Sequence, residues 1–187
     1  MAPADPLPPL TGVVLAGGAG RRMGADKATL VVGGQRLVDR AVATLRPICA
    51  TVLVASGDGR RLCVPGTWEI ADAVPGSGPL GGLLAGLDRA PTRLVAVLAV
   101  DLPDADPRLL ARLAGLHRGE AAVIPRTGAR LQPLHAVWDR SAATELRRAL
   151  GEGERGVQRL LARLPVRVVE VPGDGYARNL NTPAGLA

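Results

Sequence analysis

Short runs of apolar residues alternate along the chain with longer segments in which leucine, valine and alanine recur every three or four residues. The short runs have the length of β-strands, and the longer intervals are typical of helices with one buried face. Strands are therefore predicted at 11–15, 51–55, 93–100, 121–125, 134–138 and 166–171. Helices are predicted at 37–48, 80–87, 106–116, 141–150 and 156–164. This alternation with short connections predicts a layered α/β fold around a mostly parallel sheet.

The order of these segments also indicates how the chain is organised. The nearly continuous apolar character of 11–15 is typical of a central strand that is covered on both faces. Asp106 and Pro107 form a favourable helix start, because aspartate caps the first turn and proline fits the first helical position. No repeat or long linker interrupts the pattern. One domain is therefore predicted at 10–187, after a flexible tail at 1–9 that contains four prolines.

Composition narrows the classes of partner. Aromatic residues make up only 2% of the chain, which disfavours a stacking surface for single-stranded nucleic acid. The formal net charge of +6 suits an anionic ligand, while a solvated basic surface or a basic nucleic-acid-binding face remains the alternative. Cys49 and Cys63 have neither disulfide nor zinc spacing, and both are expected to be buried, reduced thiols.

The chain shows no targeting or membrane-spanning segment. Its first ten residues lack the basic region of a signal peptide. No apolar run approaches the roughly 20 residues that span a bilayer. We therefore expect a cytoplasmic protein whose partners include neither nucleic acid nor a membrane.

A glycine-rich segment, Leu15-Ala-Gly-Gly-Ala-Gly-Arg-Arg-Met-Gly-Ala-Asp-Lys27, follows the first predicted strand directly. It ends on Lys27, which is the single lysine beside twenty-two arginines. A lysine ammonium is a compact point charge that can lie against one phosphate oxygen, whereas arginine is a planar fork. The glycines allow backbone N–H groups to approach phosphate closely. The spacing fits neither a Walker A loop nor a dinucleotide-binding G-x-G-x-x-G motif, so 15–27 is interpreted as a phosphate site of another kind.

Other polar residues offer oxygen ligands. Asp101 follows the predicted strand 93–100, at the edge where ligands bind in open α/β sheets. On the residues alone, binding of Mg²⁺ and a capping or loop role both stay open for Asp101. Asn179 and Asn181 share one face of an extended segment and suit a metal, or Asn181 caps a last short helix. Asp72 lies in a loop, where a solvated carboxylate is the simpler interpretation.

Several motifs together resemble a known family. The glycine-rich segment is similar to the signature of sugar-nucleotide and related nucleotidyltransferases. More narrowly, the chain resembles the molybdenum cofactor guanylyltransferases, within the MobA-like nucleotidyltransferases. The later motifs that carry this resemblance are Asp72, Gly78-Pro-Leu-Gly-Gly82, Asp101-Leu-Pro103, Gln132-Pro-Leu134 and Asn179-Leu-Asn-Thr-Pro183. The resemblance implies a three-layer Rossmann-like nucleotidyltransferase fold and transfer of GMP from GTP to the terminal phosphate of molybdopterin, with release of pyrophosphate.

The same resemblance implies roles for individual residues. It implies catalytic roles for Lys27, Arg22 and Asp101, and Mg²⁺ ligation by Asp101 and Asn181. It implies nucleotide contacts for Leu15, Ala16, Gly17, Gly18, Lys27, Asp72, Gly78 and Asp101. His135 stands where the family often has an aromatic residue, and it is expected to pack beside the pterin. Where the family often has an asparagine after its second strand, this chain has Ala55 and Ser56.

The resemblance also implies partners, and alternatives remain beside it. GTP and molybdopterin are the implied substrates, and other proteins of the cofactor pathway and acceptor molybdoenzymes are the implied partners. A relative that uses CTP or a sugar-phosphate acceptor is the nearest enzyme alternative. A non-catalytic carrier of nucleotide or pterin is a third interpretation, against which the intact Arg22, Lys27 and Asp101 speak.

Overall fold

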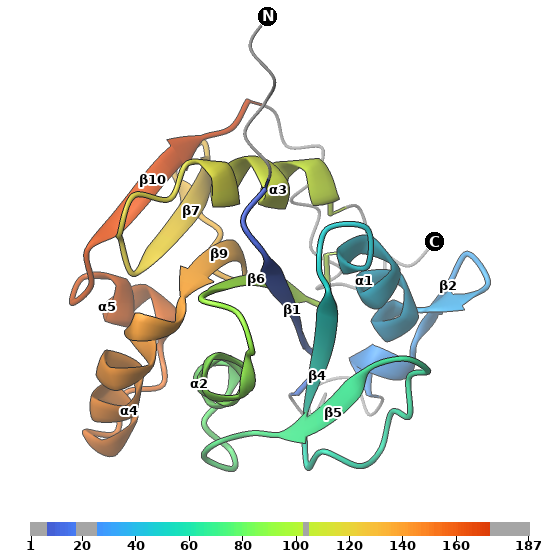
Figure 1. The fold of residues 1–187 in the computed structure, drawn as a ribbon. Coiled ribbons are helices and arrows are strands. Elements are labelled where there is room, and N and C mark those ends of the chain that lie inside the picture. Colours follow the sequence, from blue (N-terminus) through green and yellow to red (C-terminus); the bar gives the residue numbers. More distant parts are fainter. Residues whose placement is uncertain (1–6, 18–25, 103–104, 173–187) are drawn as a thin grey trace, which may run out of the picture.

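Figure 1 shows the computed structural model of the chain, which describes residues 7–17, 26–102 and 105–172. The described strands are β1 (Leu10–Leu15), β2 (Val31–Val32), β3 (Gln35–Arg36), β4 (Thr51–Gly57), β5 (Trp68–Ala71), β6 (Leu94–Ala99), β7 (Ala122–Thr127), β8 (Arg130–Leu131), β9 (His135–Asp139) and β10 (Val166–Glu170). The α-helices are α1 (Leu37–Leu45), α2 (Pro79–Arg89), α3 (Pro107–Gly115), α4 (Ala143–Gly151) and α5 (Val157–Leu161). Two 3₁₀ turns, η1 (Lys27–Thr29) and η2 (Arg140–Ala142), complete the described elements.

The central sheet has β1 in its interior. In the described part of the chain its order is β10-β7-β9-β6-β1-β4-β5, with β8 beside β7. β1 pairs in parallel with both β4 and β6, and β4 pairs in parallel with β5. β9 is antiparallel to β6 and β7, whereas β10 is parallel to β7. The predicted mostly parallel α/β sheet is thus confirmed, and the antiparallel pairing of β9 and of the short β8 makes it mixed.

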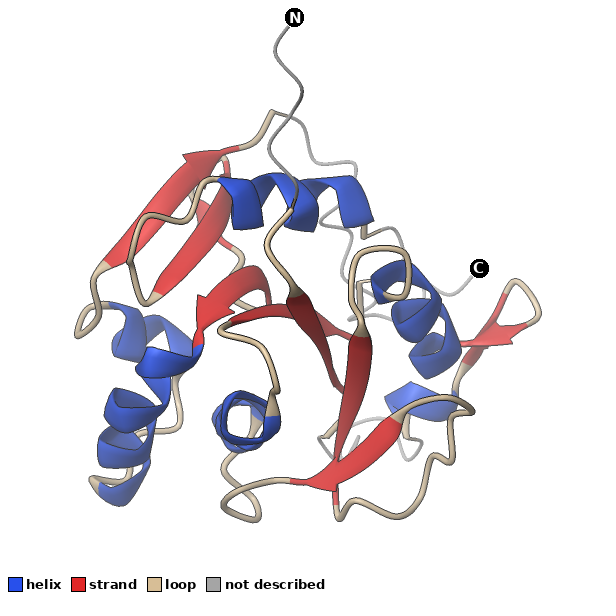
Figure 2. Cartoon of the chain, viewed as in Figure 1, coloured by secondary structure: helices blue, strands red, loops and turns tan. Residues whose placement is uncertain are grey.

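Helices cover both faces of this sheet, which makes three layers (Figure 2). One buried cluster contains residues of α1 and α3, and the other contains residues of α2, α4 and α5. Alternate residues of a strand point to opposite faces, so Val14 of β1 contributes to the first cluster while Val13 and Leu15 contribute to the second. β1 is buried along its whole length, as its apolar sequence predicts.

Most predicted elements are confirmed, and the missed ones are short or exposed. β5 has a single buried residue, Ile70, and its Trp68 is 72% exposed, so its sequence lacks the pattern of a buried strand. The β2–β3 hairpin has no buried residue. Periodicity reports burial rather than backbone pairing, and these strands bury too little to show it.

The expectation that both cysteines are buried is wrong for one of them. Cys49 is half-buried, and its burial raises the pKa of the thiol to about 12. Cys63 is exposed, and it lies in the loop between β4 and β5 with a φ of 46°. Its backbone N–H donates to Glu69 at 3.0 Å. A hydrophobic residue type is therefore placed on the surface by the path of its loop.

The predicted helix start at Asp106 is confirmed. The Asp106 carboxylate accepts a hydrogen bond from the Arg108 N–H at 2.8 Å, and Pro107 is the first residue of α3. Helices in the described part of the chain lack the length and apolar character that crossing a membrane requires. The division into a tail at 1–9 and one domain at 10–187 stays a prediction.

A close contact between α2 and β1 yields a test of the packing. A Cβ added at Gly86 would lie 2.7 Å from both methyl carbons of Val13, which is fully buried. We expect Gly86→Ala to lower the free energy of unfolding by about 1–3 kcal/mol, because the tight core must shift to admit the methyl group.

Gly151→Ala is the matched control, because a Cβ there meets nothing within 4 Å. It should leave stability unchanged or raise it by up to about 1 kcal/mol through helix propensity. Denaturant unfolding of both variants measures the difference. Equal effects at the two glycines would contradict the tight contact between α2 and β1.

Candidate active site

The carboxyl ends of the central strands meet at one edge of the sheet. Leu15 at the end of β1 is in register with Ala55 of β4 and with Ala99 of β6. Beyond this register, the Ala16 N–H donates to the Ala55 carbonyl at 2.8 Å, and the Val100 N–H donates to the Leu15 carbonyl at 3.2 Å. The segments after β1, β4 and β6 therefore leave the sheet side by side, which is where ligands bind in open α/β folds.

Asp101 and Lys27 face each other at this edge. Asp101 comes two residues after the end of β6, and its carboxylate oxygen lies 4.0 Å from the Lys27 Nζ. The fold thus brings together two predicted catalytic residues that are far apart in the sequence. Burial raises the pKa of the Asp101 carboxyl above its ordinary 3.8, and the charge of Lys27 offsets part of that rise. Because burial has the larger effect on the pKa, the ionised carboxylate would be stabilised by a further cationic ligand.

Asp72 lies at the same edge, directly after β5. Burial raises the pKa of its carboxyl above 3.8, while the Gly57 backbone and the charge of Arg61 act in the opposite direction. Its Oδ1 is buried and has no hydrogen-bond partner among residues 7–17, 26–102 and 105–172. The interpretation of Asp72 as an ordinary solvated loop residue is therefore wrong. An unpartnered buried carboxylate oxygen is costly unless a ligand supplies a donor.

Glycines allow two segments to approach this carboxylate. A Cβ at Gly17, after β1, would lie 3.3 Å from Asp72 Oδ2 and from the Gly57 nitrogen. A Cβ at Gly82, in the first turns of α2, would lie 3.2 Å from Asp72 Oδ1. Gly78 caps α2 with a φ of 64°, a conformation that strongly favours glycine. The glycines of the 78–82 motif thus set the approach of α2 to Asp72.

The remaining predicted site residues divide into two groups. Leu15 and Ala16 are buried in the core, so only their backbone can face a ligand. Arg22, Gly18, Asn179 and Asn181 lie outside the described residues. Their proposed contacts therefore stay predictions.

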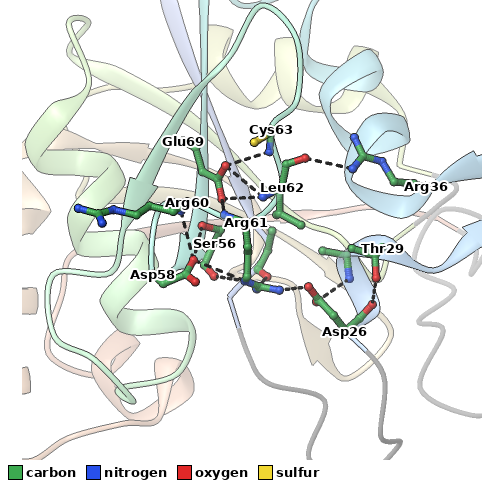
Figure 3. A network of polar contacts seen from close by, with 12 residues as sticks. Asp26, Thr29, Arg36, Ser56, Asp58, Arg60, Arg61, Leu62, Cys63 and Glu69 are labelled. Carbon is green, nitrogen blue, oxygen red and sulfur yellow. Dashed lines mark hydrogen bonds and ion pairs between the residues drawn. The ribbon is translucent and has the colours of Figure 1, made fainter.

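A polar network beside Gly17 was not anticipated from the sequence (Figure 3). Arg61, in the loop between β4 and β5, forms an ion pair with Asp26 and donates from Nη2 to the Ala16 carbonyl at 2.8 Å. The Glu69 carboxylate of β5 accepts hydrogen bonds from the backbone N–H groups of 61–63. In the sequence, Arg60-Arg61 is one of three Arg-Arg pairs, and nothing there shows which of its two arginines forms these contacts.

His135 is buried close to this edge, at the start of β9. Its Nε2 has no hydrogen-bond partner in the described part of the chain, and burial lowers the pKa of the imidazole to about 4. The ring is therefore neutral at pH 7. Its expected position beside the pterin stays a prediction.

Asp139 and His117 form a second buried polar group at the opposite end of β6. Asp139 accepts hydrogen bonds from Arg93 Nε at 2.7 Å and from the Ser141 N–H at 2.8 Å. His117 Nε2 lies 3.3 Å from the same carboxylate. Burial opposes ionisation here, but the bonds from Ser141 and Arg93 hold the pKa of Asp139 below 3.8. This group stabilises the fold and takes no part in the edge that carries Asp101.

Comparisons with known proteins agree with this geometry. Residues 12–168 match the family model described as the MobA-like NTP transferase domain. A probable molybdenum cofactor guanylyltransferase of Chloroflexus aggregans is 39% identical over 190 residues, covering 95% of this chain and 91% of the relative. The crystal structure of molybdopterin-guanine dinucleotide biosynthesis protein A from Archaeoglobus fulgidus has a TM-score of 0.77 and 29% identity, with 94% of each chain covered. A Mycobacterium tuberculosis protein solved in complex with manganese has the same fold, with a TM-score of 0.72, 21% identity and 95% of each chain covered.

The raised pKa of Asp101 yields a test of protein stability. Its pKa is raised in the folded state, so the folded protein holds this proton to a higher pH than the unfolded chain does. Ionisation then weakens folding as the pH rises through the folded-state pKa. We expect Asp101→Asn to raise the Tm of the ligand-free protein at pH 7, and the gain to shrink as the pH falls towards 3.8.

Asp139→Asn is the control of opposite sign. Its pKa is lowered on folding, so the carboxylate contributes stability above 3.8 that is lost as the pH falls. We expect this variant to have a lower Tm at pH 7. Thermal unfolding of both variants between pH 4.5 and 7.5, at about five values, covers the window. A fall in Tm for both would show that burial does not dominate the ionisation of Asp101.

Proposed function

The chain belongs to the MobA-like NTP transferase family, and on that premise we propose that it transfers GMP from GTP to the terminal phosphate of molybdopterin and releases pyrophosphate. The facing pair of Lys27 and Asp101 at the carboxyl edge of the sheet is the observation that carries the proposal. Membership of the family makes the chain a nucleotidyltransferase. The choice of guanine and molybdopterin is supported by relatives named as molybdenum cofactor guanylyltransferases at 36–39% identity.

In this reaction the attacking phosphate is already anionic, so positioning and charge neutralisation dominate over base catalysis. The Lys27 ammonium stabilises negative charge on the reacting phosphate and on the departing pyrophosphate. Arg22 is proposed to share this task. A point charge suits the role because it follows a moving phosphate oxygen without demanding bidentate geometry.

Nucleotide binding is assigned to the other groups at the sheet edge. We assign the cradle for the nucleotide to the backbone of 15–18, together with Gly78 at the start of α2. Asp72 Oδ1 is buried without a hydrogen-bond partner among the described residues and can accept a hydrogen bond from a hydroxyl or N–H of the nucleotide. Such a bond would remove the cost of leaving that oxygen unsatisfied.

The residues present fit a divalent cation. Mg²⁺ binds one or two protein oxygens together with substrate phosphates and water. Asp101 offers a carboxylate whose pKa is raised by burial, so a bound cation would stabilise its ionised form. Asn181 is proposed as a second ligand. When bound, the cation would neutralise phosphate charge. A structure of a protein with this fold in complex with manganese supports a divalent metal, and magnesium is our proposal for this chain.

Other partners and the location of the protein stay predictions. Contacts with proteins of the cofactor pathway and with acceptor molybdoenzymes follow from the family resemblance, and a cytoplasmic location stays an expectation from the sequence. A CTP-dependent relative and a non-catalytic carrier make different predictions for the assay below.

A nucleotide panel tests the proposed function. GTP, CTP, ATP and UTP are each supplied with molybdopterin and Mg²⁺, and pyrophosphate release is measured. We expect turnover with GTP, its loss on chelation of the metal, and its return on addition of Mg²⁺. Preference for CTP would overturn the guanine assignment. Nucleotide binding without pyrophosphate release would favour the carrier.

Substitution of the lysine tests its proposed role. Removing an electrostatic donor of this kind costs about 3 kcal/mol of transition-state stabilisation, so Lys27→Ala should lower turnover roughly 10²-fold. Lys27→Arg should recover only part of the activity, because the planar fork does not replace a point charge. Circular dichroism and Tm confirm folding. A folded Lys27→Ala protein with near-normal turnover would contradict the catalytic role proposed for Lys27.

A further inference from the structure

Arg61 joins the two ends of the glycine-rich segment. Its Nη2 donates to the carbonyl of Ala16, which follows β1, and its Nη1 forms an ion pair with Asp26, which precedes η1 (Figure 3). Its Nε donates at 2.9 Å to the carbonyl of Ser56 at the end of β4. One guanidinium therefore ties the ends of β1 and β4 to the start of η1.

The backbone of Arg61 is itself held in place. Its N–H donates to Glu69 Oε1 at 2.8 Å, and the next two N–H groups, of Leu62 and Cys63, donate to the same carboxylate. Burial opposes ionisation of this acid, but hydrogen bonds from Ser56 and these three amides lower the pKa of Glu69. β5 thus anchors the loop from which the Arg61 side chain extends. A guanidinium on an anchored backbone loses less conformational entropy when it binds.

Asp26 connects the contacts of Arg61 to the position of Lys27. The Asp26 carboxylate accepts from the Ala28 N–H at 3.1 Å and so caps η1, the turn that begins at Lys27. The Thr29 hydroxyl donates to the Asp26 carbonyl at 2.9 Å. A residue that fixes Asp26 therefore also fixes the base of the lysine side chain, whose Nζ lies 4.0 Å from Asp101.

The charge of Arg61 is already engaged by protein groups. Besides the ion pair with Asp26, its Nε lies 3.7 Å from Asp58 Oδ1. The side chain is 29% exposed, and its three nitrogens point at carbonyl and carboxylate oxygens. These contacts suit a residue that orders the site rather than one that binds phosphate directly.

We propose that Arg61 is a positioning residue of nucleotidyl transfer, which holds both ends of the glycine-rich segment and thereby sets Lys27 against Asp101. The inference rests on the proposed function and adds to it a residue outside the family motifs. It predicts that Arg61 acts on the rate of the chemical step through Lys27. Misplacement of a catalytic group by about 1 Å can cost on the order of 10²-fold in rate.

A mutant cycle tests this dependence. We expect Arg61→Gln to lower kcat by about ten- to a hundredfold, with a much smaller change in the KM for GTP. In a Lys27→Ala background the same substitution should cost little more, because residues that act as one unit are not additive. Arg61→Lys should recover little, since one ammonium cannot make the three contacts. Arg60→Gln, at the exposed neighbour, is the matched control and should retain wild-type kcat.

A measurement without turnover separates the two proposals. Asp26→Asn and Arg61→Gln should each lower Tm. The double variant should lose less Tm than the two single losses added together, because both substitutions remove the same contact.

Wild-type kcat in Arg61→Gln, or an equal loss of kcat in both lysine backgrounds, would overturn the positioning role. If the wild-type protein releases no pyrophosphate, the proposed function and the role of Arg61 in transfer both fail. Coupled Tm losses would then still establish the Asp26–Arg61 contact, and additive losses would overturn that contact as well.

Discussion

The parallel register of β1 with β4 and β6 is the constraint on which the site depends. Because Leu15 stands level with Ala55 and Ala99, the segments after these strands start from the same edge. Residues from distant parts of the sequence, Asp101 and Lys27 among them, reach one another there without any long side chain having to cross the sheet. The two buried clusters that flank β1 hold this register, since a slip by one residue would turn its side chains to the wrong faces.

The same edge carries a cost in stability. The pKa values of Asp72 and Asp101 are both raised by burial, and no residue that the structure describes donates a hydrogen bond to Asp72 Oδ1. The ionised form of each carboxyl is more stable in water than at this edge, so burying the two groups lowers the stability of the folded protein. At the opposite end of β6, Asp139 is only 2% exposed and accepts hydrogen bonds from Arg93 and Ser141. Buried acids that lack partners are typical of functional sites, so this contrast supports the role proposed for the edge that carries Asp72 and Asp101.

The sequence predicts the parts of this arrangement that follow from burial or from local chemistry. Continuous apolar strands, the amphipathic helices and the Asp106 cap have signals of that kind, and the strand that ends before Asp101 places this residue at the edge. The exposed strand β5 has no such signal, although it positions Asp72 and Glu69. Arg61 was missed for a related reason. Its contacts with Ala16 and Asp26 depend on how the loop between β4 and β5 folds back, which no residue pattern encodes. Cys63 is exposed by that same loop.

The distribution of the two kinds of cation follows from the work each performs. Arg61 must satisfy two carbonyls and a carboxylate from fixed directions, and a planar guanidinium with several N–H donors meets that demand. Lys27 lies 4.0 Å from the Asp101 carboxylate, and in the proposed reaction it would also have to follow phosphate oxygens as they change charge and position. A flexible ammonium can do so, whereas a guanidinium held by several partners cannot. The chain otherwise uses arginine as its cation. Arginine suits position 61, where the partners have fixed directions, and lysine suits position 27, where the proposed partner moves during the reaction.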